Sequence, residues 1–231
     1  MNVERLRDHL TEIRDRIDAA KERVGRSDEV GIVAVTKTHP AAVVEAALEV
    51  GLGRIGENRV QELEAKVAAV GRDRAEWHLI GHLQRNKVRK ALPLFDLIHS
   101  IDSLRLAREL SKEAERAGVE VSGLVQVNTS GEESKYGFDS EEAVEAVAQI
   151  AELPRLRIRG LMTMAPFTDD EATLRRTFAA TRELLRRCAE QVPAFEPEHL
   201  SMGMSNDFEI AVEEGSTLVR LGTILFGERT T

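Results

Sequence analysis

The sequence has little of what marks secreted or membrane proteins. It contains 1 cysteine, Cys188, which leaves no partner for an internal disulfide and is typical of a reducing compartment. No apolar run approaches the roughly 20 residues of a membrane-spanning helix. The N-terminal segment MNVERLRDHL is charged from its start and lacks the apolar centre of a signal peptide. We therefore expect a cytoplasmic protein that does not enter a membrane.

Positive charge is also in short supply. The 40 acidic residues outnumber the 32 Lys and Arg, which gives a net charge of −8. Because nucleic-acid phosphates favour a basic surface, this balance argues against DNA or RNA as a partner. One basic segment, QRNKVRK over residues 84–90, is expected to be a solvated helix face. A contact with a small anion or with a protein is the alternative for that segment.

What is present is enough apolar sequence for a large core. The chain has 231 residues, of which 42% are hydrophobic and 31% are charged. No low-complexity linker or change of composition divides the sequence. Residues 1–231 are therefore expected to form a single domain.

Apolar periodicity predicts an alternation of helices and strands. An amphipathic stripe over residues 3–24 predicts a first helix that ends near Gly25. Helical patterns then alternate with strand-like segments at residues 31–36, 54–56, 77–80, 97–101, 123–127, 158–162, 199–202 and 218–226. This repetition predicts a closed (β/α)8 TIM barrel with an additional N-terminal helix. The alternative, an open doubly wound sheet, is disfavoured because the turn TKTHPAA lacks the glycines of a dinucleotide-binding loop.

One lysine directly follows an apolar strand. Lys37 ends the segment GIVAVTK, whereas the other lysines have polar or charged neighbours in the sequence. In a parallel barrel, functional residues gather at the carboxyl ends of the strands. Apolar surroundings favour the uncharged, nucleophilic amine, so Lys37 is a candidate for Schiff-base chemistry. The alternative is a lysine whose ammonium group only reaches solvent at the barrel rim.

Two segments near the C-terminus predict a phosphate site. In HLSMGMSNDFEIAVEEG a helix is expected to start around Ser205 or Asn206, with Glu209 completing a capping box. In LVRLGTILFG, Gly222 allows a close backbone approach and Thr223 adds a hydroxyl. The loops after the seventh and eighth strands of such barrels frequently bind phosphate. The alternative is an ordinary capped helix and a turn glycine.

An arginine interrupts the last apolar strand. Arg220 needs a partner there, because an unpaired buried charge is costly. The partner is either a carboxylate at the barrel rim or the ring nitrogen of a bound cofactor. His78, His82 and His99 match no strong metal-ligand spacing, so no metal is expected.

Together these motifs resemble those of the pyridoxal phosphate homeostasis protein family, relatives of the N-terminal barrel of alanine racemase. The matching stretches are AVTKTHP, IGENRVQE, WHLIGHLQRNK, HSIDS, GLMTM and LSMGMSNDFEIAVEEGSTLVRLGTILFG. The resemblance implies that Lys37 attaches pyridoxal 5′-phosphate (PLP) covalently as a Schiff base and that Arg220 faces the pyridine nitrogen. It also implies that Ser201, Ser205, Gly222 and Thr223 hold the phosphate, and that Asn58, His82 and Met162 line the ring.

The resemblance implies a cofactor-binding protein of intracellular PLP homeostasis, without established catalytic turnover. Such a protein is expected to be monomeric, with PLP-dependent apo-enzymes as possible recipients of the cofactor. A second hypothesis is a fold-type III, racemase-like enzyme acting on a small amino acid. The sequence has 1 tyrosine, Tyr136, and nothing in the sequence marks it as the second base of a racemase. A third hypothesis is an aldolase-like enzyme in which Lys37 forms a Schiff base with a phosphorylated sugar.

Overall fold

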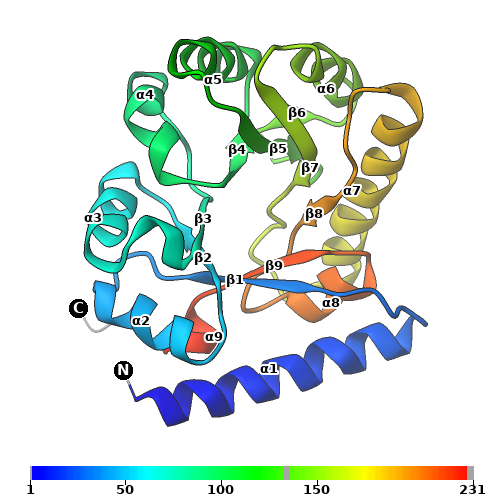
Figure 1. Ribbon diagram of the computed structural model, residues 1–231. Helices are drawn as coiled ribbons and strands as arrows, with labels where there is room; N and C mark the ends of the chain where they lie inside the picture. Colours follow the sequence, from blue (N-terminus) through cyan, green and yellow to red (C-terminus); the bar gives the residue numbers. More distant parts are fainter. Residues whose placement is uncertain (1, 133–135, 228–231) are drawn as a thin grey trace.

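The protein is a closed barrel of parallel strands (Figure 1). The computed structural model describes residues 2–132 and 136–227. Neighbouring strands run in the order β1-β2-β3-β4-β5-β7-β8-β9, and β9 pairs with β1 to close the ring. The strands are β1 (Gly31–Val35), β2 (Arg54–Glu57), β3 (Glu76–Leu79), β4 (Leu97–Ile101), β5 (Val121–Asn128), β7 (Leu156–Met162), β8 (His199–Ser201) and β9 (Leu218–Leu221). The predicted TIM barrel is therefore confirmed, and a two-residue strand, β6 (Phe138–Asp139), is added beside β5.

Helices alternate with the strands around the barrel as the sequence predicts, except that residues 223–226, predicted as strand, are also helical. They are α2 (Ala41–Glu49), α3 (Val60–Val70), α4 (Val88–Ala91), α5 (Leu104–Ala117), α6 (Ala143–Ala151), α7 (Glu171–Gln191), α8 (Phe208–Glu213) and α9 (Thr223–Phe226). Short 3-10 turns cover Arg72–Arg74, Arg85–Lys87 and Leu92–Leu94. None of the helices in the described part of the chain is long and apolar enough to cross a membrane.

The additional N-terminal helix, α1 (Val3–Arg23), lies along the outside of the barrel (Figure 1). Its apolar stripe is buried against α2, α8 and α9, with Leu6 and Ala20 fully covered. The Nδ1 atom of His9 lies 3.0 Å from the carbonyl oxygen of Leu225, so α1 also contacts the last helix. The stripe therefore packs on the barrel of its own chain.

Two sequence predictions about the C-terminal segments were wrong in detail. The last strand ends at Leu221 rather than at residue 226, because the backbone of Gly222 turns and its carbonyl accepts the amides of Leu225 and Phe226. The predicted capping box is also absent. Helix α8 begins after Asp207, whose carboxylate accepts the amide of Met204 (2.6 Å), and Glu209 forms an ion pair with Arg16 of α1.

Alternate side chains on each strand divide the apolar core into two parts. One part lies inside the barrel and contains Val33, Leu97, Leu124, Met162 and Leu218. The larger part lies between the strands and the helices, where Trp77 and Phe178 are fully buried. Burying both layers supplies the main stabilisation, and it fixes which side chains point along the barrel axis.

A buried ion pair supports the carboxyl ends of β1 and β2. Lys66 of α3 is only 5% exposed, and its Nζ donates to Glu57 Oε1 (2.5 Å) and to the carbonyl of Thr36 (2.6 Å). Thr36 Oγ1 also donates to Glu57 Oε1, so the pair fixes the backbone immediately before Lys37. Burial raises the pKa of Glu57, although the hydrogen bond from Lys66 opposes the increase. Lys66 is therefore a buried lysine that its context in the sequence does not mark.

We predict that Lys66→Met lowers the free energy of unfolding by about 3–5 kcal/mol at neutral pH, because it leaves the Glu57 carboxylate buried without a cation. Without Lys66 the pKa of Glu57 rises further, so the carboxyl binds a proton as the pH falls. The difference in free energy of unfolding between Lys66→Met and the unmodified protein is therefore expected to shrink as the pH falls towards 4.5, the ordinary carboxyl pKa. Denaturant unfolding across this pH range provides the measurement.

Lys90→Met is the matched control, because Lys90 pairs with Glu64 on the surface, where both side chains are about half exposed. Lys90→Met is expected to lower the free energy of unfolding by less than about 1 kcal/mol over the whole pH range. This account of the Lys66–Glu57 pair would be contradicted if the two variants lost equal free energy of unfolding. It would also be contradicted if the loss in Lys66→Met did not depend on pH.

Candidate functional site

A cavity of about 620 Å³ opens at the carboxyl ends of the strands. This volume is within the range of small-molecule sites, about 300–1,000 Å³. Seven of the predicted site residues line it: Lys37, Asn58, His82, Ser205, Arg220, Gly222 and Thr223. Met162 and Ser201 are buried in the barrel interior and do not line it. Sequence positions that are far apart are therefore brought together by the closure of the barrel.

Lys37 reaches this cavity because it continues the inward-facing positions of β1. Val33 and Val35 lie four and two residues before it, the first inside the barrel and the second on the cavity wall. The next residue, Thr38, has φ +67, which is unfavourable for a β-branched side chain. Its amide donates to Glu62 Oε2 at 2.8 Å, a contact that helps to hold this strained turn. Backbone strain of this kind is often found at functional sites.

The wall of the cavity next to β1 is a pair of turns after β8 and β9. The Oγ atom of Ser205 accepts the amide of Ile224 at 3.4 Å, which joins the two turns. At Gly222 an added Cβ would lie 3.2 Å from the carbonyl oxygen of Val35, so the end of β9 approaches β1 closely. At Gly203, with φ +94, an added Cβ would lie 2.6 Å from the Ala211 side chain. These glycines allow the hydroxyls of Ser205 and Thr223 to face one cavity.

Arg220 is a buried cation at the base of the cavity. Its NH1 donates to Ser201 Oγ (2.6 Å) and its NH2 donates to the carbonyl of Thr163 (2.9 Å). Burial lowers its pKa to about 10, with the carboxylate of Asp207 opposing the decrease. The guanidinium therefore remains charged at neutral pH. The hydroxyl of Ser201 is directed at Arg220 and at His99, since Ser201 Oγ also lies 2.9 Å from His99 Nδ1.

His82 and Asn58 form a polar side of the cavity. His82 Nδ1 lies 2.7 Å from Asp102 Oδ2, and Tyr136 stacks on the His82 ring with 4.7 Å between centroids. Asn58 lies close to His82 because Gly81 packs on the Asn58 backbone. A Cβ added to Gly81 would lie 2.3 Å from the Asn58 carbonyl oxygen. No three His, Cys, Asp or Glu side chains in the described ranges are grouped as a metal site.

Sequence reasoning missed the cavity residues from the middle of the chain. Gln126 of β5 lines the cavity and donates through Nε2 to the carbonyl of Tyr136 at 3.1 Å. The alternation of β5 contains a signal for this residue, because Leu124 lies two positions earlier in the barrel interior. Phe167 also lines the cavity from a loop, and no periodicity of the sequence marks it.

The chain is similar to known proteins over nearly its whole length. Residues 9–230 match the family described as alanine racemase, N-terminal domain. A pyridoxal phosphate homeostasis protein from Aquifex aeolicus is 41% identical over 223 residues, which cover 96% of this chain and 97% of the relative.

Two solved structures extend the comparison. The structure of PipY from Synechococcus elongatus PCC7942 with PLP bound has a TM-score of 0.85 at 37% identity, covering 96% of this chain and 100% of that chain. Alanine racemase from Clostridium difficile 630 has a TM-score of 0.80 at 15% identity, covering 100% of this chain and 61% of that chain, and shares the fold. The chain belongs to the pyridoxal phosphate homeostasis protein family, within the wider family of alanine racemase N-terminal domains.

Proposed function

We propose that this protein binds PLP through a Schiff base on Lys37 and acts in intracellular PLP homeostasis without catalytic turnover. The observation that carries the proposal is the common cavity of Lys37, Arg220 and the Gly222–Thr223 turn. These groups come from β1 and β9, which pair in the register Val33 with Arg220. The PLP in the related PipY structure supports the same ligand here.

The residues of the cavity fit the three functional groups of PLP. When bound, PLP supplies an aldehyde that a primary amine can attack. The Nζ atom of Lys37 forms a C=N bond to that aldehyde carbon, and the carbonyl oxygen leaves as water. Ser205 and Thr223 offer hydroxyl donors to the phosphate beside the Gly222 turn, where a Cβ would crowd the end of β1. We assign Ser201 to Arg220 rather than to the phosphate, because its hydroxyl contacts the guanidinium.

Arg220 determines how the bound ring would behave. A guanidinium donates hydrogen bonds but does not release its proton near neutral pH, so it leaves the pyridine nitrogen unprotonated. The ring is then a weaker electron sink than one paired with a carboxylate. The resemblance to the alanine racemase class implies the same arginine, so Arg220 supports PLP binding and does not by itself separate a carrier from a racemase. We propose PLP-dependent apo-enzymes as the recipients of the cofactor and a cytoplasmic monomer as the working form.

A second candidate function is favoured by the His82 side of the cavity. His82 is held by Asp102, and Tyr136 stacks on the imidazole while lining the same cavity as Lys37. These side chains could move a proton on a small amino acid, which would make the protein a slow fold-type III enzyme. Incubation of the loaded protein with alanine enantiomers in deuterated water distinguishes the two. The carrier proposal predicts no exchange at the α-carbon, and exchange that Tyr136→Phe and His82→Gln abolish would establish the enzyme.

We predict that Lys37→Ala abolishes the visible absorption band of the protein mixed with PLP, without loss of folding. Borohydride reduction of the unmodified protein adds hydride to the C=N carbon and a proton to nitrogen, which makes the attachment permanent. Peptide mass mapping should then find the reduced cofactor on Lys37. Lys87→Ala is the control, since Lys87 lines a neighbouring cavity and should leave the band intact. A full band in Lys37→Ala would refute the assignment.

We also predict that pyridoxal, which lacks the phosphate, binds at least about tenfold more weakly than PLP, because hydrogen bonds to charged groups contribute about 1.5–3 kcal/mol each. Ser205→Ala and Thr223→Val should weaken PLP binding and leave pyridoxal binding nearly unchanged. Titration followed by absorbance measures the affinity of each protein for both ligands. Equal affinities of the unmodified protein for PLP and pyridoxal would remove these turns from the binding site.

A further inference from the structure

A line of polar side chains crosses the barrel interior below Arg220. Glu76 Oε1 lies 3.0 Å from His78 Nε2, and His78 Nδ1 lies 2.8 Å from His99 Nε2. His99 Nδ1 lies 2.9 Å from Ser201 Oγ, which accepts a hydrogen bond from Arg220 NH1. We call these five residues the hydrogen-bond relay. His78, His99 and Ser201 are buried, and the members come from β3, β4, β8 and β9.

The two ends of the relay have fixed roles. A guanidinium can only donate hydrogen bonds, and a carboxylate can only accept them. The hydrogen bond to His78 lowers the pKa of Glu76 to about 2, so Glu76 is an acceptor at neutral pH. Burial, together with the charge of Arg220, holds the pKa of His99 well below its ordinary value. His99 is therefore a neutral imidazole, which donates from one nitrogen and accepts at the other.

One arrangement uses every donor and acceptor of the relay. Arg220 donates to Ser201 Oγ, and the Ser201 hydroxyl donates to His99 Nδ1. His99 then donates from Nε2 to His78 Nδ1, and His78 donates from Nε2 to Glu76. The opposite arrangement has a proton on Nδ1 of both imidazoles. Ser201 Oγ would then accept from both of its partners, His99 and Arg220, and its own hydroxyl proton would have no acceptor in a fully buried site.

We propose that Glu76, His78 and His99 are positioning residues for Arg220. The carboxylate of Glu76 fixes both imidazoles as Nε2–H tautomers, and the resulting direction of hydrogen bonding turns a lone pair of Ser201 towards the guanidinium. Arg220 is thereby held at the base of the Lys37 cavity by a group at the other end of the barrel. The expected effect on PLP binding rests on the proposed function, whereas the expected tautomers of His78 and His99 do not.

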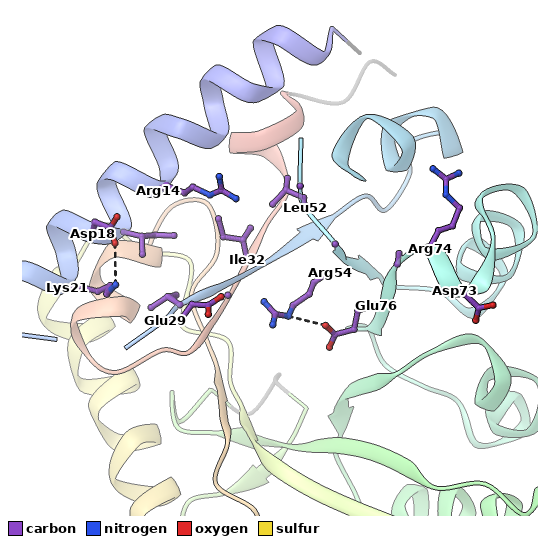
Figure 2. Close-up of a pocket in the computed structure, with 16 residues that line it drawn as sticks. Arg14, Asp18, Lys21, Glu29, Ile32, Leu52, Arg54, Asp73, Arg74 and Glu76 are labelled. Carbon is purple, nitrogen blue, oxygen red and sulfur yellow. Dashed lines mark hydrogen bonds and ion pairs between the residues drawn. The ribbon is translucent and has the colours of Figure 1, made fainter. Parts of the chain in front are cut away.

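The far end of the relay is accessible from the amino-terminal mouth of the barrel. Glu76 lines a cavity of about 640 Å³ there, and Arg54 Nε donates to Glu76 Oε2 at 3.1 Å (Figure 2). The Glu76 side chain is 42% exposed. Other titratable groups close to the relay are His199 of β8, whose pKa is lowered by burial and by Arg159, and Asp207 beside Arg220. A change of charge at one mouth is thus passed to the other through hydrogen bonds.

The first test is nitrogen NMR of the histidines in protein without PLP, at neutral pH. We expect His78 and His99 both to carry the proton on Nε2. Glu76→Ala should abolish this single preference, and Glu76→Gln should retain it, because the amide oxygen still accepts from His78. Since Glu76 is partly exposed, these variants should fold, and thermal unfolding checks that they do. A proton on Nδ1 of His99 in the unmodified protein would overturn the proposal.

The second test measures what the relay does to the cofactor site. Glu76→Ala should weaken PLP binding about 2- to 30-fold and shift the midpoint pH of the visible absorption band. Glu29→Ala is the matched control, since Glu29 lines the same amino-terminal cavity and is not part of the relay. An equal shift in Glu29→Ala would mean that only long-range charge acts, and no change in Glu76→Ala would also overturn the proposal. If the unmodified protein shows no band, the proposed function fails, while the NMR result still decides the tautomers.

Discussion

The pairing of β1 with β9 is the contact on which the site depends. It joins strands from opposite ends of the sequence and puts Val33 in register with Arg220. Lys37 and the Gly222 turn extend from these two strands, so their separation is set by the hydrogen bonds of a parallel ladder. A parallel pair needs a crossover connection, and here the crossover is the rest of the barrel. The closure that completes the fold therefore also assembles the cavity.

The interior of this barrel combines an apolar layer with a polar column. Most interior positions of a TIM barrel are occupied by branched apolar side chains, as at Val33, Leu97 and Leu218 here. His78, His99 and Ser201 depart from that rule, and each finds its hydrogen bonds within the barrel. A buried polar group that is fully paired costs little and gives a unique geometry. The column thus gives Arg220 a defined orientation that an apolar interior could not provide.

The sequence predicts the barrel because βα periodicity is a local property of each segment. It also predicts Lys37 and Arg220, since Lys37 follows a run of apolar residues and Arg220 interrupts one. The burial of Lys66 could not be predicted in this way, because its partner Glu57 is reached only when α3 packs on the ends of β1 and β2. The His78–His99 contact joins two strands and has no local signal. The end of β9 was missed because the apolar residues of LGTILF suit a strand and a buried helix equally well.

The position of α1 has a consequence for the order of folding during synthesis. The helix is made first, yet two of the elements that cover its stripe, α8 and α9, are among the last of the described chain. Until they are made, α1 lacks two of the three helices on which it mainly packs, and β1 lacks its β9 neighbour. Long-range contacts of this kind slow folding and leave apolar surface exposed for longer. The nascent chain therefore carries an open barrel with an uncovered first helix, a state in which chaperone binding at residues 3–23 would be most effective.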